Sequence, residues 1–338
     1  MPQGIRLAVV GITGAVGQEI IRVLEQRDFP VSELIALADP REAGSKVQFK
    51  GESITVEAAE EKAFRRAEVA LFAVGNDISL MLAPLAQKAG CLVIDNSYAF
   101  RLRDGVPLVV PEVNPEDIAA HQGIIANPNC STIIMAVAIN PIYRAAGIKR
   151  LVVSTYQAVS GAGINGLREL EQQSRDYLEG RDGTPEVFAH PIPFNLIPHI
   201  DIFVDEDYTR EEMKMVWETR KIFHAPDMLI APTCVRVPVF RSHSESINIE
   251  TERPLSVAAA RELLKSAEGI VLQDDPAQNQ YPMPRYTSDK DEVFVGRLRR
   301  DLSVDNGIAM WVAADQIRKG AATNAIQIAE RVVADNLF

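Results

Sequence analysis

The sequence predicts an α/β protein of two domains, a doubly wound parallel sheet followed by an α+β domain. Short apolar runs alternate with helical patterns over roughly the first 127 residues, the element order of a parallel sheet with right-handed crossovers. A glycine-rich turn, Gly11–Gly17, separates the first apolar run from the first helical pattern. From about Leu151 strand patterns become frequent, which is typical of a mostly antiparallel sheet.

The first domain is expected to begin with a strand at Ile5–Val10, because a nearly continuous apolar run suits a parallel strand buried on both faces. A helix over Gly14–Gln26 follows, since its apolar residues recur at helical spacing. The unit then repeats, with strands expected at Leu34–Ala38, Val69–Val74 and Leu92–Ile94 and a helix over Ser79–Ala89.

The second domain is expected to contain an apolar helix at Ile133–Ala146 and strands at Leu151–Val159, Thr233–Phe240 and Ser246–Glu250. The Pro-rich stretch Pro185–Pro198 and the acidic helical segment Tyr208–Phe223 are interpreted as insertions over this sheet. The last segment, Ala321–Leu337, has the pattern of an amphipathic helix. We therefore expect a first domain over residues 1–127, joined by a C-terminal helix at 320–338, and a second over 128–319.

The composition is that of an ordinary soluble globular protein. The chain has 338 residues, of which 47% are hydrophobic and 24% charged, enough to bury a sizeable core. The 35 basic and 46 acidic residues give a net charge of −11. Because nucleic acids and anionic membranes bind basic faces, this balance argues against both as partners. If the substrate is an anion, the basic residues that bind it must form a local positive site on an otherwise acidic protein.

Neither a signal peptide nor a membrane span is indicated, because the N-terminus runs straight into a strand pattern and no apolar run has the length of a span. The 3 cysteines are too few for a disulfide framework and lack the spacing of a zinc site. We expect a cytoplasmic protein with reduced thiols and no metal.

The turn Gly11–Gly17 reads GITGAVG and carries the first candidate binding site. It follows a strand and opens a helix, where glycines let a backbone approach a pyrophosphate and helix N–H groups can hold it. The glycine pattern by itself is equally compatible with a purely structural turn. Its position between a strand and a helix favours a dinucleotide-binding site. Asp39 lies about 20 residues after the last glycine and suits a ribose 2′-hydroxyl, whereas Arg41 suits a 2′-phosphate. The sequence thus leaves NAD and NADP both open.

Cys130 is the candidate nucleophile. It stands in the polar segment Asn127–Thr132, directly before the apolar helical pattern. A helix N-terminus stabilises a thiolate through its dipole and unpaired N–H groups. Burial in the core is the usual state of a free cysteine, and we expect it for Cys91 and Cys234, which lie within apolar or strand segments.

A cysteine that attacks a carbonyl needs an acid/base partner. Among the five histidines, His243 is the best candidate because it stands at the end of a strand, although an exposed loop histidine is an equally weighted alternative. The glycines of Ser160–Gly163 would allow a flat ring to approach closely. Arg101, Lys214 and Arg236 are candidate anion contacts, since guanidinium pairs bidentately with carboxylate or phosphate; each also suits an ordinary surface charge.

Together these segments resemble the bacterial aspartate-β-semialdehyde dehydrogenases. The resemblance covers essentially the whole chain, and its specific motifs are NPNC at the candidate cysteine and RVPVxRxH at the candidate histidine. The other segments that carry it are GITGAVG, AFR, PLVVPEVN, YQAVSGAG, HPIPFNLIPHID, EEMK and IRKGAATNAIQIAE.

The resemblance implies a Rossmann-type domain and a catalytic and dimerisation domain like that of glyceraldehyde-phosphate dehydrogenase. It implies reductive dephosphorylation of L-aspartyl 4-phosphate to L-aspartate 4-semialdehyde through a cysteine thioester, in lysine, threonine, methionine and diaminopimelate biosynthesis. Inorganic phosphate would be the second ligand, and the protein would be a homodimer.

Roles for individual residues are implied in the same way. Cys130 would be the acylated nucleophile, Gln157 would orient the acyl group, and His243 would be the acid/base. Arg101 and Lys214 would bind phosphate, Arg236 the substrate carboxylate, and Glu211 would lie beside the substrate. Residues assigned to the cofactor are Gly11, Thr13, Gly14, Ala15, Val16, Arg41, Glu42, Ser160, Gly161 and Gln316.

The implied cofactor is NADP, with NAD as the alternative, and here the chain departs from the family. Asp39 and Glu42 replace residues that are commonly small and polar, and two carboxylates should repel a 2′-phosphate. Gln316 replaces an asparagine often found near the cofactor.

Two other functions are weighed against this one. N-acetylglutamyl-phosphate reductase performs the same chemistry on a longer acyl phosphate, and NPNCST argues against it. A catalytically silent, nucleotide-binding paralogue would be expected to lack Cys130, Gln157 or His243, and all three are present.

Overall fold

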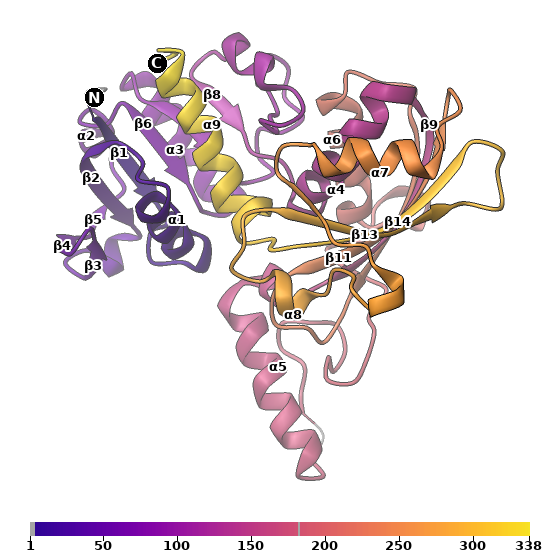
Figure 1. Cartoon of the computed structure of the whole chain (residues 1–338). Coiled ribbons are helices and arrows are strands. Elements are labelled where there is room, and N and C mark those ends of the chain that lie inside the picture. Colours follow the sequence, from indigo (N-terminus) through magenta and orange to yellow (C-terminus); the bar gives the residue numbers. More distant parts are fainter. Residues whose placement is uncertain (1–3, 182) are drawn as a thin grey trace. The chain divides into compact units, whose positions relative to one another are not determined.

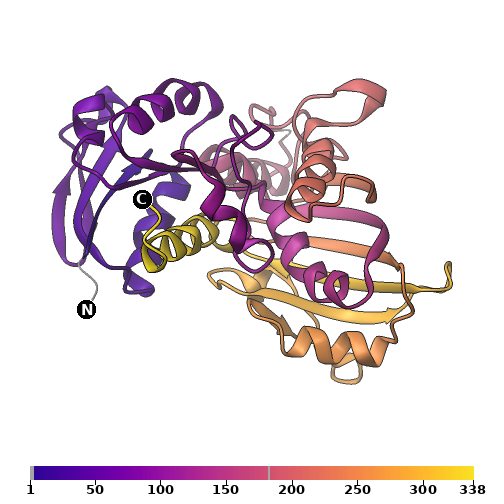
Figure 2. The same cartoon turned by 90° about the horizontal axis from the view of Figure 1, so that it is seen from above.

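The structure is a computed structural model that describes residues 4–181 and 183–338. It divides into two compact units (Figures 1 and 2). The first unit holds the chain up to Asn129 together with Ala321–Phe338, and the second holds Cys130–Gly320. Within the described residues, no helix is long and apolar enough to cross a membrane.

The first unit is built on a six-stranded sheet in the order β5-β2-β1-β6-β7-β8, with every neighbouring pair parallel. Because β1 lies between β2 and β6, the chain winds outward from it in both directions, as in doubly wound nucleotide-binding folds. The expected fold class of the first domain is confirmed. The strands are β1 (Ile5–Val10), β2 (Val31–Ala38), β5 (Glu57–Ala58), β6 (Val69–Phe72), β7 (Leu92–Asp95) and β8 (Ile124–Ala126), with a separate hairpin of β3 (Lys46–Phe49) and β4 (Glu52–Thr55).

The core of the first unit lies between this sheet and the helices beside it. The last four residues of β1 are almost completely buried, as a continuous apolar run predicts. The C-terminal helix α9 contacts both α1 and β7 and contributes Ile326 and Ala329 to the same apolar cluster as Leu7 and Val9. The helices are α1 (Ala15–Gln26), α2 (Glu61–Phe64), α3 (Asn76–Lys88) and α9 (Thr323–Ala334), with short 3₁₀ turns at Pro40–Glu42 and Pro115–Ala120. A π-helical turn at Arg318–Ala322 includes the last residues of the second unit and the first residues of the C-terminal segment.

The second unit contains a mixed six-stranded sheet in the order β10-β9-β11-β14-β13-β12. The pairs β9–β11, β11–β14 and β13–β14 are antiparallel, whereas β9–β10 and β12–β13 are parallel. An α+β domain is therefore confirmed. The strands are β9 (Ile148–Gln157), β10 (Leu229–Arg236), β11 (His243–Thr251), β12 (Ile270–Leu272), β13 (Val293–Arg300) and β14 (Gly307–Ala314).

Three helices of the second unit form a layer on its sheet (Figure 1). Helix α4 contacts β9, β11, β13 and β14, α6 contacts β10 and α4, and α7 contacts β12, β13 and α4. The expectation that Tyr208–Phe223 is an insertion is wrong, because α6 lies within this segment and packs directly on the sheet. The helices are α4 (Cys130–Ala146), α5 (Gly163–Leu178), α6 (Arg210–Ile222), α7 (Val257–Lys265) and α8 (Pro284–Thr287).

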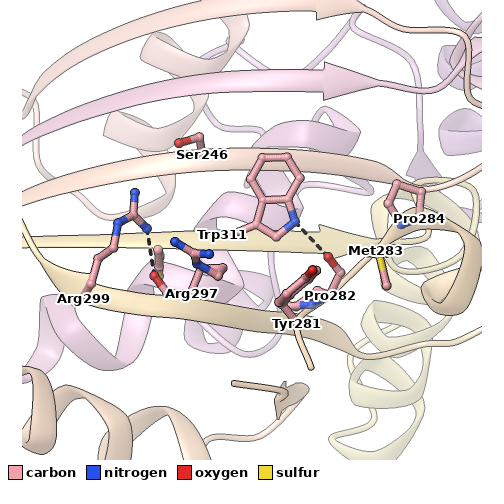
Figure 3. Close-up of a pocket in the computed structure, with 9 residues that line it drawn as sticks. Ser246, Tyr281, Pro282, Met283, Pro284, Arg297, Arg299 and Trp311 are labelled. Atoms are coloured by element: carbon pink, nitrogen blue, oxygen red, sulfur yellow. Dashed lines mark hydrogen bonds between the residues drawn. The ribbon is translucent and has the colours of Figure 1, made fainter. Parts of the chain in front are cut away.

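The opposite face of this sheet carries half-buried side chains. Tyr156 and Trp311 lie there with their ring centroids 5.3 Å apart. A pocket of about 340 Å³ opens beside Trp311, whose indole N–H donates to the carbonyl of Pro282 over 2.9 Å (Figure 3). Arg297 and Arg299 line the same pocket. This aromatic and cationic surface is distinct from the helix-covered face.

Candidate active site

Helix α4 begins at Cys130, which places the thiol at the positive end of the helix dipole. The side chain is half-buried. Gly320 packs against it, and a Cβ added at Gly320 would lie 2.8 Å from the Cβ of Cys130. Only glycine permits the backbone after β14 to approach the side chain of Cys130 so closely.

The other two cysteines have the buried surroundings expected of them. Burial raises the pKa of the Cys91 thiol to about 12. Burial, followed by the carboxylates of Glu211 and others, also raises the pKa of Cys234. A thiol must ionise to act as a nucleophile, so these two remain inert and Cys130 is the candidate.

His243 is the first residue of β11 and is fully buried. Its Nε2 lies 3.5 Å from the Sγ of Cys130, within hydrogen-bond distance for sulfur. The backbone N–H of Ala158 donates to Nδ1 over 3.0 Å. Since Nδ1 is an acceptor there, the neutral imidazole carries its proton on Nε2, facing the sulfur.

The surroundings of His243 favour this neutral form. Burial, reinforced by the charge of Arg236 and opposed by Glu211, lowers the pKa of His243 to about 3. An imidazolium would also place a second proton on Nδ1, against the N–H of Ala158. The pair therefore suits a thiolate that accepts a hydrogen bond from a neutral Nε2–H.

A chain of polar contacts starts at Gln157, the last residue of β9. Its Nε2 donates to Oε1 of Glu211 over 3.0 Å, and the other oxygen of Glu211 accepts from Lys214 Nζ, also over 3.0 Å. Lys214 donates in addition to Asp201 over 2.9 Å, and Asp201 accepts two bonds from Arg210. The structure thus brings together the predicted residues Gln157, Glu211 and Lys214.

Arg236 ends β10 beside Gln157 on β9. It is 7% exposed, and its Nη1 donates to the carbonyl of Ala158 over 2.6 Å. Burial lowers the pKa of its guanidinium and the charge of Glu211 opposes the shift, but arginine stays a cation at neutral pH. A Cβ at Gly161 would lie 2.8 Å from Nη1 and 3.3 Å from His243 Cε1, so a larger residue there would displace the Arg236 guanidinium.

The remaining predicted residues of the second unit, Ser160 and Gln316, hydrogen-bond to each other. Gln316 Nε2 donates to Ser160 Oγ over 2.5 Å, and its Oε1 accepts from the backbone of Ser242 over 2.9 Å. Gln316 therefore ties the turn after β9 to the residue that precedes His243. Its side chain has partners within the protein at both polar atoms.

In the first unit, two glycines of the turn Gly11–Gly17 lie so close to backbone atoms that no side chain fits at them. Gly11 has φ +79°, and a Cβ there would lie 2.4 Å from the carbonyl oxygen of Ala73. A Cβ at Gly17 would lie 2.2 Å from the oxygen of Gly11, so this glycine lets α1 pack on the turn. Gly14 is the N-cap of α1 and makes no side-chain cap bond. Thr13, Ala15 and Val16 complete the turn and the start of the helix.

The residues expected near a ribose form their own contacts. Nε and Nη2 of Arg41 donate to the two oxygens of Asp39 over 2.8 and 3.0 Å. These bonds lower the pKa of Asp39 to about 2. Thr13 donates to Glu42 over 2.9 Å. Arg41, a predicted cofactor residue, is thus held by the carboxylate of Asp39.

Arg101 belongs to the first unit, after β7. It is 7% exposed and its Nη2 donates to the carbonyl of Asn96 over 2.7 Å. Among the described residues, no group of three or more His, Cys, Asp or Glu side chains could hold a metal ion.

Four residues around the site were missed in the sequence. Thr155, Ala158, Asp201 and Gly320 contact the predicted residues directly. Period-two alternation along β9 would have placed Thr155 on the face of Gln157. Asp201 closes the quoted motif HPIPFNLIPHID, but no pattern indicates that it pairs with Lys214.

Two family models match the chain. Residues 6–121 match the model described as semialdehyde dehydrogenase, NAD binding domain, and residues 139–319 match semialdehyde dehydrogenase, dimerisation domain. An aspartate-semialdehyde dehydrogenase of Aquifex aeolicus is 52% identical over 99% of this chain and 100% of its own length.

Solved structures are similar to this chain over nearly its whole length. Aspartate semialdehyde dehydrogenase II of Vibrio cholerae complexed with ASA has a TM-score of 0.96 at 48% identity, covering 98% of this chain and 99% of its own. The Candida albicans enzyme with NADP has a TM-score of 0.78 at 26% identity, covering 99% and 100%. From its sequence, its fold and the matched models, the chain belongs to the aspartate-semialdehyde dehydrogenase family.

Proposed function

We propose that the protein reduces L-aspartyl 4-phosphate to L-aspartate 4-semialdehyde with release of phosphate, in the biosynthesis of lysine, threonine, methionine and diaminopimelate. The observation that carries the proposal is the thiol of Cys130 at the start of α4, 3.5 Å from the Nε2 of His243. The same unit supplies the contacts between Gln157, Glu211 and Lys214. This combination suits acyl transfer from a phosphate to sulfur.

In the proposed reaction the Cys130 thiolate attacks the acyl carbon, the carbon–sulfur bond forms, and phosphate leaves with the electrons of the carbon–oxygen bond. A nicotinamide cofactor, held by the residues assigned to it below, would supply a hydride to the thioester carbon. Collapse of the resulting oxyanion expels the thiolate and releases the aldehyde. Nε2–H of His243 and the N–H groups at the start of α4 can stabilise the oxyanion, and one proton from solvent is taken up by the phosphate.

The cations serve the two anionic ends of the substrate. Lys214, held by Glu211 and Asp201, is proposed to bind the phosphate, and Arg236 the α-carboxylate, with Glu211 beside the substrate. Arg101 is proposed as a further phosphate ligand on the family resemblance alone. Since the chain carries a net charge of −11, these cations act against an unfavourable overall field.

The turn of the first unit fits a dinucleotide, because a Cβ at Gly11 or Gly17 would collide with backbone and α1 offers an N-terminus without a side-chain cap. We assign Gly11, Thr13, Gly14, Ala15 and Val16 to the pyrophosphate side. Arg41 and Glu42 are assigned to the ribose side, and Ser160, Gly161 and Gln316 to the nicotinamide side, with Gln316 acting through Ser160.

We propose NADP as the cofactor, with a weakened preference over NAD. Asp39 holds Arg41 and, with Glu42, should repel the 2′-phosphate. The ratio of kcat/KM for NADPH to that for NADH is expected to be below about 100, or about 2.7 kcal/mol. Asp39→Ser should raise this ratio about 10-fold, whereas Glu33→Ser on β2 should leave it unchanged. A wild-type ratio above about 100 would contradict the proposal.

A homodimer is proposed from the matched dimerisation model at residues 139–319. The half-buried aromatic face of Tyr156 and Trp311 is the surface we assign to it, because such a face is typical of an interface. Sedimentation as a single 37.2 kDa chain would contradict this assignment.

The assay that tests the function is run in reverse. With inorganic phosphate, aspartate semialdehyde is expected to reduce NADP⁺, and omission of phosphate should stop turnover because the thioester then has no acceptor. N-acetylglutamate semialdehyde, the substrate of the alternative function, is expected to be inactive, since Arg236 and Glu211 are buried at 7% and 5% exposure and leave little freedom for a longer acyl chain. Preference for the N-acetylated aldehyde would favour the alternative.

A further inference from the structure

Thr155 lies two residues before Gln157 on β9 and therefore on the same face of the sheet. It is fully buried. The register places Cys234 of β10 beside it on one side and Glu245 of β11 on the other. Thr155 thus belongs to the row of side chains that lies directly behind the residues of the active site.

The hydroxyl of Thr155 donates to Oε1 of Gln157 over 3.3 Å. At the other end of the same amide, Nε2 donates to Glu211 over 3.0 Å. An ionised carboxylate only accepts, so the NH₂ of Gln157 must face Glu211 and its oxygen must face Thr155. Gln157 is 1% exposed, and the protein itself thus holds both ends of the amide.

The sulfur of Cys234 does not replace the Gln157 amide as the acceptor of the Thr155 hydroxyl proton. Thr155 also contacts the sulfur of Cys234, but burial raises the pKa of that thiol and keeps it protonated. Cys234 donates in turn to the sulfur of Met215 over 3.8 Å. Gln157 Oε1 is a stronger acceptor than a thiol, so the proton of Thr155 goes to the amide.

We propose that Thr155 is a positioning residue that fixes the orientation of the Gln157 amide for the reaction. The inference rests on the proposed function, in which Gln157 orients the acyl group. Thr155 acts through Gln157 and does not touch the substrate. Without its hydroxyl, Oε1 of Gln157 would be left buried with no donor, and the amide would be held at one end only.

Thr155→Val removes the hydroxyl and keeps the shape of the side chain. We expect kcat/KM for aspartate semialdehyde to fall about 10-fold, the effect of one hydrogen bond, and Thr155→Ser to restore it to within about twofold. The matched control is Thr219→Val on α6: Thr219 is equally buried, and its hydroxyl has no hydrogen-bond partner among the described residues. That variant should keep wild-type kcat/KM.

A second readout separates positioning from general disruption. The rate at which iodoacetamide alkylates Cys130 depends on its pairing with His243, and we expect Thr155→Val to leave it unchanged. A parallel fall in alkylation rate and activity would overturn the proposal, as would failure of Thr155→Ser to rescue. If Thr155→Val does not fold, Thr155→Ala is expected to show the same 10-fold fall.

Two further variants distinguish an error in the role of Thr155 from an error in the proposed role of Gln157. Cys234→Ala should keep activity, because the proposal routes the effect through Gln157. If Gln157→Ala lowers activity and Thr155→Val does not, the positioning role alone is wrong. If Gln157→Ala itself keeps wild-type activity, the proposed role of Gln157 is wrong and the inference falls with it.

Discussion

Cys130→Ala is expected to lower kcat for the phosphate-dependent oxidation of aspartate semialdehyde at least about 10⁴-fold, because the variant has no atom that can carry the acyl group. The fold should be unaffected, since Cys130 is half-buried and Gly320 already packs closely against its Cβ. The measurement is the initial rate of NADPH formation with saturating aldehyde and phosphate.

The control for this variant is Cys91→Ala, which removes a buried thiol whose pKa is raised to about 12. It should retain the wild-type rate, and iodoacetamide should inactivate it as it inactivates the wild type. A Cys130→Ala protein that still turns over would exclude the thioester. In that case the aldehyde would have to be oxidised without a covalent bond to the protein.

His243→Gln is expected to flatten the dependence of stability on pH. The fold lowers the pKa of His243 to about 3, from an ordinary value of 6.5. Between these values the unfolded chain binds a proton that the folded chain does not, so the stability of the wild type decreases as pH falls from 6.5 towards 3. The loss from this group is about 2 kcal/mol between pH 6.5 and pH 5, and the variant lacks it.

Urea unfolding of both proteins at the two pH values measures this difference. The free energy of unfolding of the wild type should approach that of the variant as the solution is acidified. Other titrating groups are common to both proteins and cancel in the comparison. Equal pH dependence in the two proteins would show that His243 is not held neutral by the fold.

Much of the fold follows from patterns within short segments. The apolar run of Ile5–Val10 and the glycine turn after it predict a parallel strand and the helix that follows it, because both depend on local spacing. The pattern of Tyr208–Phe223 predicts the helix correctly, but the expectation that this helix is an insertion is wrong. Its packing on β10 depends on a face-to-face contact with a strand distant in sequence, which periodicity does not report.

The active site shows the same limit. The local settings of Cys130 and His243 predict each residue separately, but the two are 113 residues apart, and only the folded sheet brings their side chains together. The polar contacts of Lys214 with Asp201, and of Gln316 with Ser160, likewise join separate segments. Residue type predicts which groups suit the chemistry, whereas strand register decides which of them meet.

The hydrogen bond from Ala158 to His243 has an evolutionary consequence. The donor is a backbone N–H, which every amino acid except proline possesses. Many histidines in proteins have their tautomer set by an acidic side chain and lose it when that residue mutates. Here any residue except proline at position 158 can donate the same hydrogen bond, provided that the backbone keeps its conformation. Substitutions at position 158 can therefore accumulate without a change in the tautomer of His243.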